Sequence, residues 1–242
     1  MNLCIDQGNS SSKIGLFDKN TLIDSFIFKT INFNDIYSLL NKYKIDACIL
    51  SSVISDNYEL KRVLNEKINI NFELSSKTSI PVKNRYETPD TLGKDRLAAV
   101  VGASFLKPET DILVIDAGTA ITYDFIDAKG NYEGGNIAPG VDMRLRSLHE
   151  FTQKLPLVSP SNDNPFLGKD TKSALISGAI YGIVFEIDGY INTLKIKYPQ
   201  LSTFLTGGSI FYFDNKLKNA IFAEKNLVLI GLNRILQYNV QK

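Results

Sequence analysis

The first third of the chain alternates between short apolar runs and segments with helical spacing. Apolar or alternating runs predict strands, and apolar residues three and four apart predict helices. The predicted strands cover residues 3–6, 13–18, 22–29, 47–53 and 72–74, and the predicted helices cover residues 34–43 and 58–67. Strands that alternate with helices indicate an α/β sheet with covered faces.

A long polar segment over residues 75–93 interrupts this pattern. It contains Pro81, Pro89 and Gly93, and a loop of this length in a compact domain is more often functional than idle. The α/β pattern then resumes. It predicts helices over residues 94–106, 141–152, 171–197 and 230–238, strands over residues 112–117, 121–127, 201–206 and 227–229, and loops over residues 134–140 and 156–170.

One strand-and-turn pattern occurs twice. Residues 4–9 read CIDQGN, and residues 114–119 read VIDAGT. In both, an apolar strand leads to an aspartate, one further residue, a glycine and a small polar residue before another strand. Asp6 and Asp116 lie 110 residues apart in a chain of 242 residues. A repeat at nearly half the chain length predicts a duplicated α/β unit.

The composition excludes several kinds of chemistry. With 27 basic and 26 acidic residues, the chain has no broad field for a nucleic-acid backbone. One histidine and two cysteines leave little room for a His/Cys zinc centre or a Ser-His-Asp triad. Cys4 and Cys48 are predicted to be buried thiols in a reducing compartment.

No membrane or export signal is visible in the sequence. The N-terminus lacks a basic region followed by an apolar one. The apolar run over residues 173–185 is shorter than the roughly 20 residues that cross a bilayer. We therefore expect a soluble, cytoplasmic protein without nucleic-acid or membrane partners.

The repeated strand-Asp-x-Gly turns are suited to holding a polyphosphate. Glycines let backbone amides approach phosphate oxygens. Ser10, Ser11 and Ser12 add hydroxyl donors, Lys13 adds a positive charge, and Asp6 and Asp116 can organise a cation. For either unit alone an ordinary hairpin turn is the better explanation, whereas the two units together favour the phosphate-binding interpretation. The sequence has no GxxxxGK[ST] motif, which excludes a P-loop enzyme.

A third cluster, Gly93-Lys94-Asp95-Arg96, stands at the start of a predicted helix. A helix N-terminus attracts anions, and an arginine there can bind a carboxylate in a bidentate pair. Asp95 can accept a proton from a hydroxyl that attacks a phosphoryl group. The alternative is structural, with Asp95 favouring the helix dipole and Arg96 solvated on the surface.

In this order the motifs make the chain resemble a type III pantothenate kinase, a member of the acetate-and-sugar-kinase, Hsp70 and actin superfamily. The resemblance spans most of the chain. Its motifs are Asp6-Gln7-Gly8-Asn9-Ser10-Ser11-Ser12-Lys13, the segment from Tyr86 through Pro89 to Arg96, Asp116-Ala117-Gly118-Thr119-Ala120, and Gly134-Gly135-Asn136-Ile137-Ala138-Pro139-Gly140, with weaker matches at residues 152–156, 168–171 and 206–208.

The resemblance implies a fold and an activity. The fold is two duplicated actin-like (ribonuclease H-like) lobes with mixed sheets flanked by helices, over residues 1–108 and 109–242, the second with a dimerisation helix. The activity is ATP-dependent phosphorylation of pantothenate to 4'-phosphopantothenate, the first step of coenzyme A biosynthesis. ATP, Mg²⁺ and a monovalent cation (K⁺ or NH₄⁺) would take part, and the protein would be a homodimer.

The resemblance also implies residue roles. Asp95 matches the general base, Asp116 the monovalent-cation ligand and Asp6 a candidate Mg²⁺ ligand. Gly207-Gly208 resembles the turn on the adenosine side. The ATP-binding positions match Asp6, Gln7, Gly8, Asn9, Ser10, Ser11, Ser12, Lys13 and Thr119; the pantothenate-binding positions match Tyr86, Gly93, Lys94, Asp95, Arg96 and Thr171. The family usually has Thr where this chain has Ser10, and the position of Lys94 is variable, so a contact there is expected from its backbone.

Two other functions stay open at this point. One is another small-molecule kinase of the same superfamily, and the other is a non-catalytic regulatory relative. Asp6, Lys13, Asp95 and Asp116 count against the second, because a silent copy is free to lose them.

Three features fall outside the matched motifs. His149 is expected to be structural. Gly178 and Gly182 predict a close helix contact, either inside the chain or with a second subunit. Arg144 and Arg146 point to different sides of a helix, and one of them is expected to face the site or the partner subunit.

Overall fold

The computed structural model describes residues 1–54, 58–213 and 215–240. The chain forms two compact units. The first consists of Met1–Pro108, Gly130–Glu133 and Asn226–Lys242, and the second consists of Glu109–Lys129 and Gly134–Lys225. The predicted lobes, residues 1–108 and 109–242, stay a prediction.

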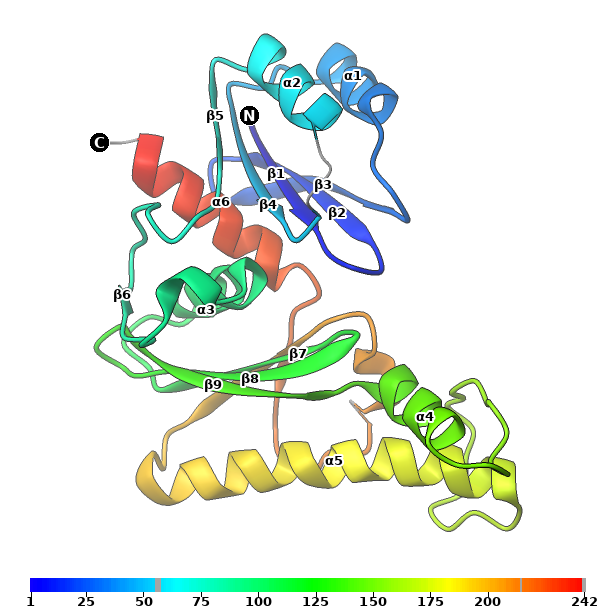
Figure 1. Ribbon diagram of the computed structural model, residues 1–242. Helices are drawn as coiled ribbons and strands as arrows, with labels where there is room; N and C mark the ends of the chain where they lie inside the picture. The colour runs from blue at the N-terminus through cyan, green and yellow to red at the C-terminus, as the bar shows by residue number, and fades with distance from the viewer. Residues whose placement is uncertain (55–57, 214, 241–242) are drawn as a thin grey trace. The chain divides into compact units, whose positions relative to one another are not determined.

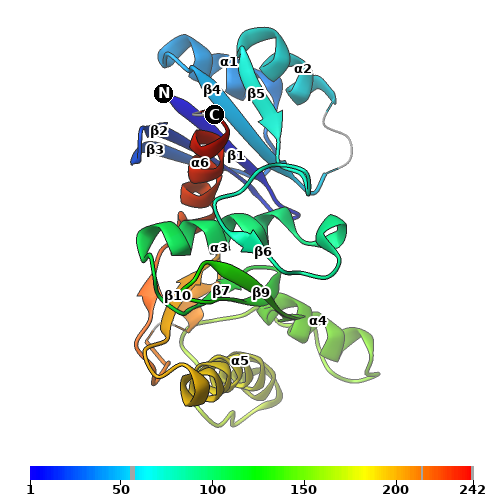
Figure 2. The ribbon, with the colours of Figure 1, turned by 90° about the vertical axis from the view of Figure 1, so that its left-hand side faces the viewer.

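The first unit is built on a five-stranded mixed sheet in the order β3-β2-β1-β4-β5. The strands are β1 (Asn2–Gln7), β2 (Ser12–Asp18), β3 (Thr21–Phe28), β4 (Ala47–Ser52) and β5 (Ile70–Glu73). β2 runs antiparallel to both β1 and β3, whereas β1, β4 and β5 are parallel. Helices α1 (Phe33–Lys42) and α2 (Tyr58–Lys67) cover one face (Figure 2).

The second unit repeats this order as β9-β8-β7-β10-β11. Its strands are β7 (Ile112–Ala117), β8 (Ala120–Ile126), β9 (Asn131–Pro139), β10 (Ser202–Thr206) and β11 (Phe222–Ala223) (Figure 1). β7 is antiparallel to β8 and parallel to β10, which is parallel to β11. The matching order and directions confirm the predicted duplication of two mixed sheets flanked by helices.

Helices α4 (Val141–Glu150) and α5 (Thr171–Lys197) supply the core beneath the second sheet. Ile180, Ile183 and Ile187 of α5 are buried against β7 and β8 residues such as Ile115 and Tyr123. By length and composition α5 is also sufficient to cross a membrane. However, 56% of its most apolar window is buried inside the protein, as in the core helix of a soluble protein.

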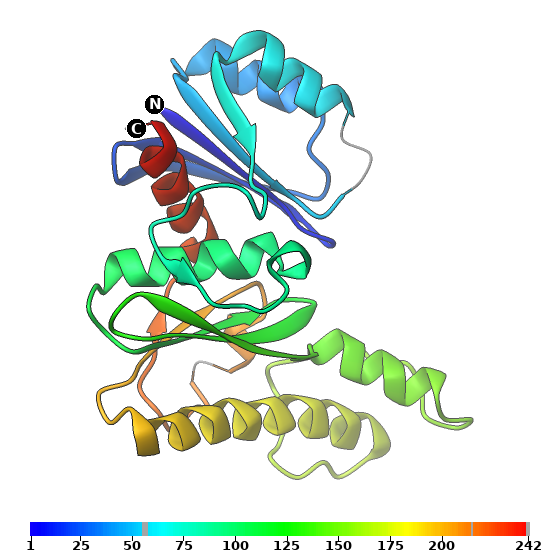
Figure 3. The same cartoon turned by 60° about the vertical axis from the view of Figure 1, so that its left-hand side comes forward.

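Helices α3 (Lys94–Leu106) and α6 (Leu227–Val240) pack against each other in the first unit (Figure 3). Glycines permit the close approach. A Cβ atom on Gly231 would lie 1.7 Å from the Ala98 carbonyl oxygen, and one on Gly102 would lie 2.4 Å from the Leu227 carbonyl oxygen. α6 also contacts β1 and β4.

The structure corrects two predicted elements. Residues 134–140 are not a loop, because β9 continues to Pro139. A Cβ atom on Gly135 would lie 1.9 Å from the Tyr123 carbonyl oxygen, so this glycine serves a close strand approach. Residues 227–229 are the first turn of α6, not a strand. A short apolar run does not distinguish a buried helix from a strand.

The polar segment over residues 75–93 is mostly irregular but contains two short elements. They are β6 (Lys83–Asn84) and the 3₁₀ turn Pro89–Thr91. β6 pairs in parallel with the start of β9, so that Lys83 is opposite Asn131 and Asn84 is opposite Tyr132. This pairing attaches the segment to residues 130–133 of the same unit.

Candidate functional site

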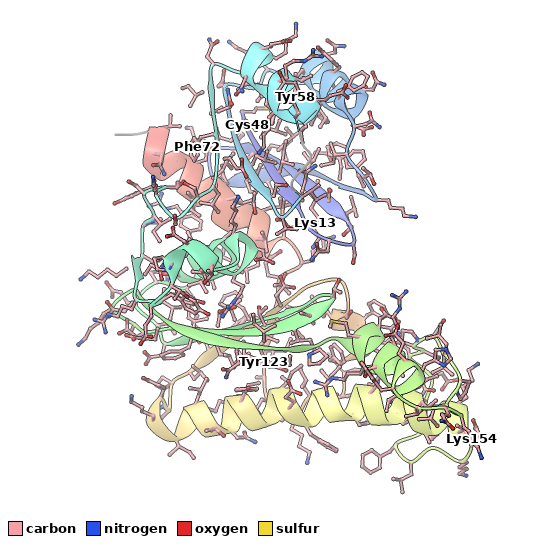
Figure 4. All side chains as sticks on the ribbon, viewed as in Figure 1. Lys13, Cys48, Tyr58, Phe72, Tyr123 and Lys154 are labelled. Atoms are coloured by element: carbon pink, nitrogen blue, oxygen red, sulfur yellow. The ribbon has the colours of Figure 1, made fainter. Side chains whose placement is uncertain are left out.

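The connection between β1 and β2 forms the predicted phosphate loop. The Gly8 amide donates to the Ser11 carbonyl at 3.1 Å, and a Cβ atom on Gly8 would lie 3.2 Å from the same oxygen. Asn9 and Ser10 at its tip are exposed. Lys13 is half-buried on β2 (Figure 4), opposite Asp6 in the strand register. The loop therefore presents polar groups at the carboxyl end of β1. Gln7 and Ser12, also predicted to bind ATP, are buried beneath it.

The carboxyl end of β4 lies beside this loop and connects it to α3. Gln7 is opposite Ser52 in the parallel register, and the Val53 amide donates to the Gln7 carbonyl at 3.1 Å. The Lys94 Nζ donates to the Ser52 carbonyl at 3.3 Å and pairs with Glu73 Oε1 at 2.8 Å. Two motifs far apart in sequence, residues 6–13 and 93–96, therefore meet at one end of the first sheet.

Asp95 lies in the first turn of α3, where its carboxylate folds back over the helix start. Its Oδ1 accepts a hydrogen bond from the Arg96 amide at 2.8 Å. A Cβ atom on Gly93, the N-cap residue, would lie 2.6 Å from that oxygen. Only glycine at residue 93 leaves room for this arrangement.

Arg96 is buried, with 5% of its surface exposed, so the alternative of a solvated surface arginine is wrong. Its guanidinium carbon lies 5.5 Å from the centre of the Tyr86 ring, within the range of a cation–π contact. The Tyr86 ring is stacked on the Tyr132 ring, with 6.2 Å between centroids and 14° between planes. Tyr86 and Arg96, both predicted to bind the acceptor, are therefore neighbours.

In the second unit three glycine turns meet at the carboxyl end of β7. The Gly140 amide donates to the Thr119 carbonyl at 3.0 Å, and a Cβ atom on Gly140 would lie 2.4 Å from that oxygen. Gly207 has φ +104°, and its own Cβ atom would collide with the Ala117 backbone. The predicted motifs around residues 116–120, 134–140 and 206–208 are thus close in space.

Asp116 stands at this strand end, opposite Thr122 on β8 and Thr206 on β10. The Thr122 hydroxyl is buried and has no hydrogen-bond partner among the described residues. A carboxylate and an unsatisfied hydroxyl on one sheet face are oxygen donors suited to a hard cation. The described residues contain no group of three His, Cys, Asp or Glu side chains that could form a closed metal site.

Thr171 is the first residue of α5, and its side chain is exposed. Asp170 caps the helix by accepting from the Ser173 amide at 3.0 Å, while the Ser173 hydroxyl donates to the carboxylate at 2.7 Å. The backbone and side-chain hydrogen bonds from Ser173 hold the pKa of the Asp170 carboxyl below its usual value. Thr171 is therefore held at a fixed helix start.

Arg144 joins three elements of the second unit. Its Nη2 pairs with Glu186 Oε2 on α5 at 2.5 Å, and its Nε donates to the Pro139 carbonyl at 2.8 Å. The Tyr123 hydroxyl donates to the other Glu186 oxygen at 2.9 Å, which is why its side chain points from β8 toward α5 in Figure 4. Burial, followed by the Glu186 contact, raises the pKa of Tyr123.

The remaining predicted features have local roles. The His149 Nδ1 lies 2.7 Å from the Leu155 carbonyl, so this side chain connects the last turn of α4 to the following loop. Cys4 and Cys48 are buried free thiols, as predicted. Burial raises the pKa of both, so neither is a ready nucleophile. Sequence reasoning missed Glu73 and Tyr132, since neither lies in a motif and only the fold brings them to Lys94 and Tyr86.

The repeated sheet and the glycine turns at its strand ends define the class of protein. It is an actin-like fold of the type used by sugar kinases. Two solved structures share the fold. A Baf family protein from Campylobacter jejuni superposes with TM-score 0.63 at 24% identity, covering 99% of this chain and 100% of that one. The polyphosphate/ATP-glucomannokinase of Arthrobacter superposes with TM-score 0.52 at 13% identity, covering 98% of both.

Sequence similarity narrows the class to one family. The model of the type III pantothenate kinases matches residues 2–193. A protein named type III pantothenate kinase from Phocaeicola vulgatus is 50% identical over 240 residues, covering 99% of each chain. The chain belongs to the type III pantothenate kinase family and is a phosphotransferase.

Proposed function

We propose that this protein transfers the γ-phosphoryl group of ATP to the primary hydroxyl of pantothenate, which forms 4'-phosphopantothenate in the first step of coenzyme A biosynthesis. The family match supports this activity. The single observation that carries it is the Lys94–Ser52 contact at the carboxyl end of β4. Through it the segment with Asp95 and Arg96 lies beside the phosphate loop.

The phosphate loop would hold the polyphosphate of ATP. The backbone and hydroxyl groups of residues 8–12 would donate to phosphate oxygens, and Lys13 would offset their charge. Thr119 would contact ATP, and the Gly207-Gly208 turn would lie on the adenosine side. Phosphoryl transfer depends mainly on positioning and electrostatics, so these residues need form no covalent intermediate.

Asp95 would be the general base. Its Oδ1 accepts from the Arg96 amide, and the second carboxylate oxygen would accept the proton of the attacking hydroxyl.

Pantothenate would be bound by Tyr86, Gly93, Lys94, Arg96 and Thr171. Arg96 would pair with the acceptor carboxylate, because the guanidinium beside the Tyr86 ring can bind a carboxylate in a bidentate pair. The Lys94 ammonium is bound to Glu73, so its contribution would come from the backbone.

Asp116 would hold K⁺ or NH₄⁺ and Asp6 would hold Mg²⁺. The cations would supply positive charge against the transferring phosphoryl group. The unsatisfied Thr122 hydroxyl supports a cation near Asp116. Mg²⁺ keeps several waters and needs only one or two carboxylates besides phosphate oxygens, and Asp6 would supply one of them.

The protein would act as a cytoplasmic homodimer formed through an apolar surface on α5. We define this α5 surface by Phe166, Gly178, Tyr181 and Phe185. Phe166 packs edge-on against Tyr181 and lies near Phe185, although Phe185 is 53% exposed. A Cβ atom on Gly178 would meet nothing within 4 Å, so no described part of the chain packs there.

The experiment that tests the activity is coupled ADP release from ATP, with and without pantothenate and K⁺. Turnover with pantothenate that rises with K⁺ is the expected result. Turnover only with another alcohol would assign a different kinase of the superfamily. An absence of turnover with every acceptor would favour a regulatory relative.

A further inference from the structure

Residues 130–133 are bonded to the residues just before Tyr86, at the start of the segment predicted to bind pantothenate. We call residues 130–133 the platform. The platform starts at Gly130, whose φ is positive, and continues into the first residues of β9. The Lys83 amide donates to the Gly130 carbonyl at 2.8 Å, and the Arg85 amide donates to the Tyr132 carbonyl at 3.0 Å. Arg85 also pairs with Glu133 at 2.9 Å. The backbone just before Tyr86 is therefore fixed on this platform.

The platform ends in a ring contact with Tyr86. Tyr132 has no exposed surface, and its ring is nearly parallel to that of Tyr86, which is only partly buried. Tyr86 lies in an irregular stretch between β6 and the Pro89–Thr91 turn. Its amide donates to Asn84 Oδ1 at 2.9 Å, which fixes its backbone, whereas Tyr132 restricts the plane of its ring.

The plane of Tyr86 in turn matters for Arg96. The guanidinium is buried and lies over the Tyr86 ring. A cation–π contact depends on the cation facing the ring, so a rotated ring would leave a buried charge less well compensated. Tyr132 on β9 therefore contacts Tyr86 in the irregular stretch, and Tyr86 contacts Arg96 on α3.

We propose that Tyr132 is a positioning residue of the acceptor site, which acts through the Tyr86 ring to hold Arg96 in place for the carboxylate of the acceptor. This rests on the proposed acceptor role of Tyr86 and Arg96. A supporting group that locks the geometry of a binding residue determines affinity without touching the ligand.

The test compares Tyr132→Leu, which removes the ring, with Tyr132→Phe, which keeps it. We expect Tyr132→Leu to raise the KM for pantothenate by about fivefold, the scale of one aromatic pair, with the KM for ATP within about twofold of wild type. Tyr132→Phe should restore the wild-type KM. Tyr58→Leu is the matched control, because it makes the same substitution at a tyrosine that is 80% exposed on α2, outside the platform.

A double-mutant cycle with Tyr86→Leu tests whether Tyr132 affects the KM for pantothenate through the Tyr86 ring. If Tyr132 acts through Tyr86, adding Tyr132→Leu to Tyr86→Leu should raise the KM no further. Additive effects, or equal changes in both KM values, would overturn the inference. An unchanged KM in Tyr86→Leu alone would overturn the acceptor role of Tyr86 as well. Tyr132→Met, which fills the volume without a ring, replaces Tyr132→Leu if that variant does not fold.

Discussion

Asp6 and Asp116 occupy the same position in two sheets with matching strand orders, β3-β2-β1-β4-β5 and β9-β8-β7-β10-β11, the second of which β6 extends beside β9. Each stands near the carboxyl end of the central strand, between an antiparallel neighbour and a parallel one. Their partners differ, because Asp6 is opposite Lys13 whereas Asp116 is opposite Thr122. The duplicated position has therefore acquired a cationic neighbour in one unit and a hydroxyl neighbour in the other.

This difference predicts which aspartate depends on an added monovalent cation. Asp116→Ala should lose most of the activation by K⁺, because it removes the carboxylate that would hold the ion beside the Thr122 hydroxyl. Initial rates across a K⁺ series measure this, with Asp18→Ala, an exposed change at the end of β2, as the control. Unchanged K⁺ dependence in Asp116→Ala would refute the assignment.

Asp95→Asn should lower kcat by about 10²–10⁴-fold, the usual contribution of a general base. The amide keeps the size of the side chain, so the thermal unfolding midpoint should stay near that of wild type. Asp90→Asn, in the exposed turn before α3, is the matched control. Near-normal turnover in folded Asp95→Asn would remove Asp95 as the base.

Gly231→Val should destabilise the first unit. Its side chain would enter the contact between α3 and α6, where a Cβ atom lies 1.7 Å from the Ala98 carbonyl. We expect a loss of about 1–3 kcal/mol or more in the free energy of unfolding, from urea denaturation. Gly189→Ala is the contrasting helix glycine, since a Cβ atom there meets nothing within 4 Å. It should be neutral or slightly stabilising, and equal losses in both variants would contradict this explanation.

Asp188 predicts an acid-sensitive contribution to stability. Burial alone would raise its pKa, but hydrogen bonds from the Asn219 side chain and from the Lys218 and Asn219 amides outweigh burial and lower it. Because the folded pKa lies below the unfolded one, the contribution is present above about pH 4 and is lost as pH falls through the folded pKa.

Asp188→Asn should remove this pH dependence and cost about 1–3 kcal/mol at neutral pH, since a charged acceptor is lost. Urea unfolding between pH 3 and pH 7 measures both effects. An unaltered slope of stability against pH below pH 5 would show that Asp188 does not supply it.

Phe185→Glu should convert a dimer into a monomer, because it places a charge in the α5 surface. Sedimentation velocity measures the change. Ile196→Glu is the control, as Ile196 is exposed on the same helix but outside that surface. A monomeric wild-type protein, or an intact dimer of Phe185→Glu, would exclude α5 as the interface.

Elements with local signals could be predicted closely from the sequence. The bounds of α3, α5 and β7 agree with the predicted ranges, because continuous apolar periodicity and the Asp170 cap mark them. β6 cannot be predicted from the sequence, because its two residues form a strand only by pairing with residues 131–132. The sequence predicts a strand at the start of α6, because residues 227–229 are a short apolar run, and these residues are buried in the helix.

The candidate site shows the same difference between features with a local signal and features that depend on distant segments. The glycine motifs could be found because each must let backbone groups approach closely, and the structure shows those approaches at Gly140 and Gly207. The burial of Arg96 and the contribution of Tyr132 could not be found, because both depend on segments far apart in the chain. Spacing along a sequence carries no information on such pairs.

The discontinuity of the first unit has a consequence for how the protein is made. Its sheet begins at residue 2, but α6, which contacts β1, β4 and α3, follows the whole second unit along the chain. Chains generally fold from the N-terminus as they are synthesised. Here the strands of the first sheet must wait until the second unit has been synthesised, so the face of the first sheet that α6 covers stays open until then.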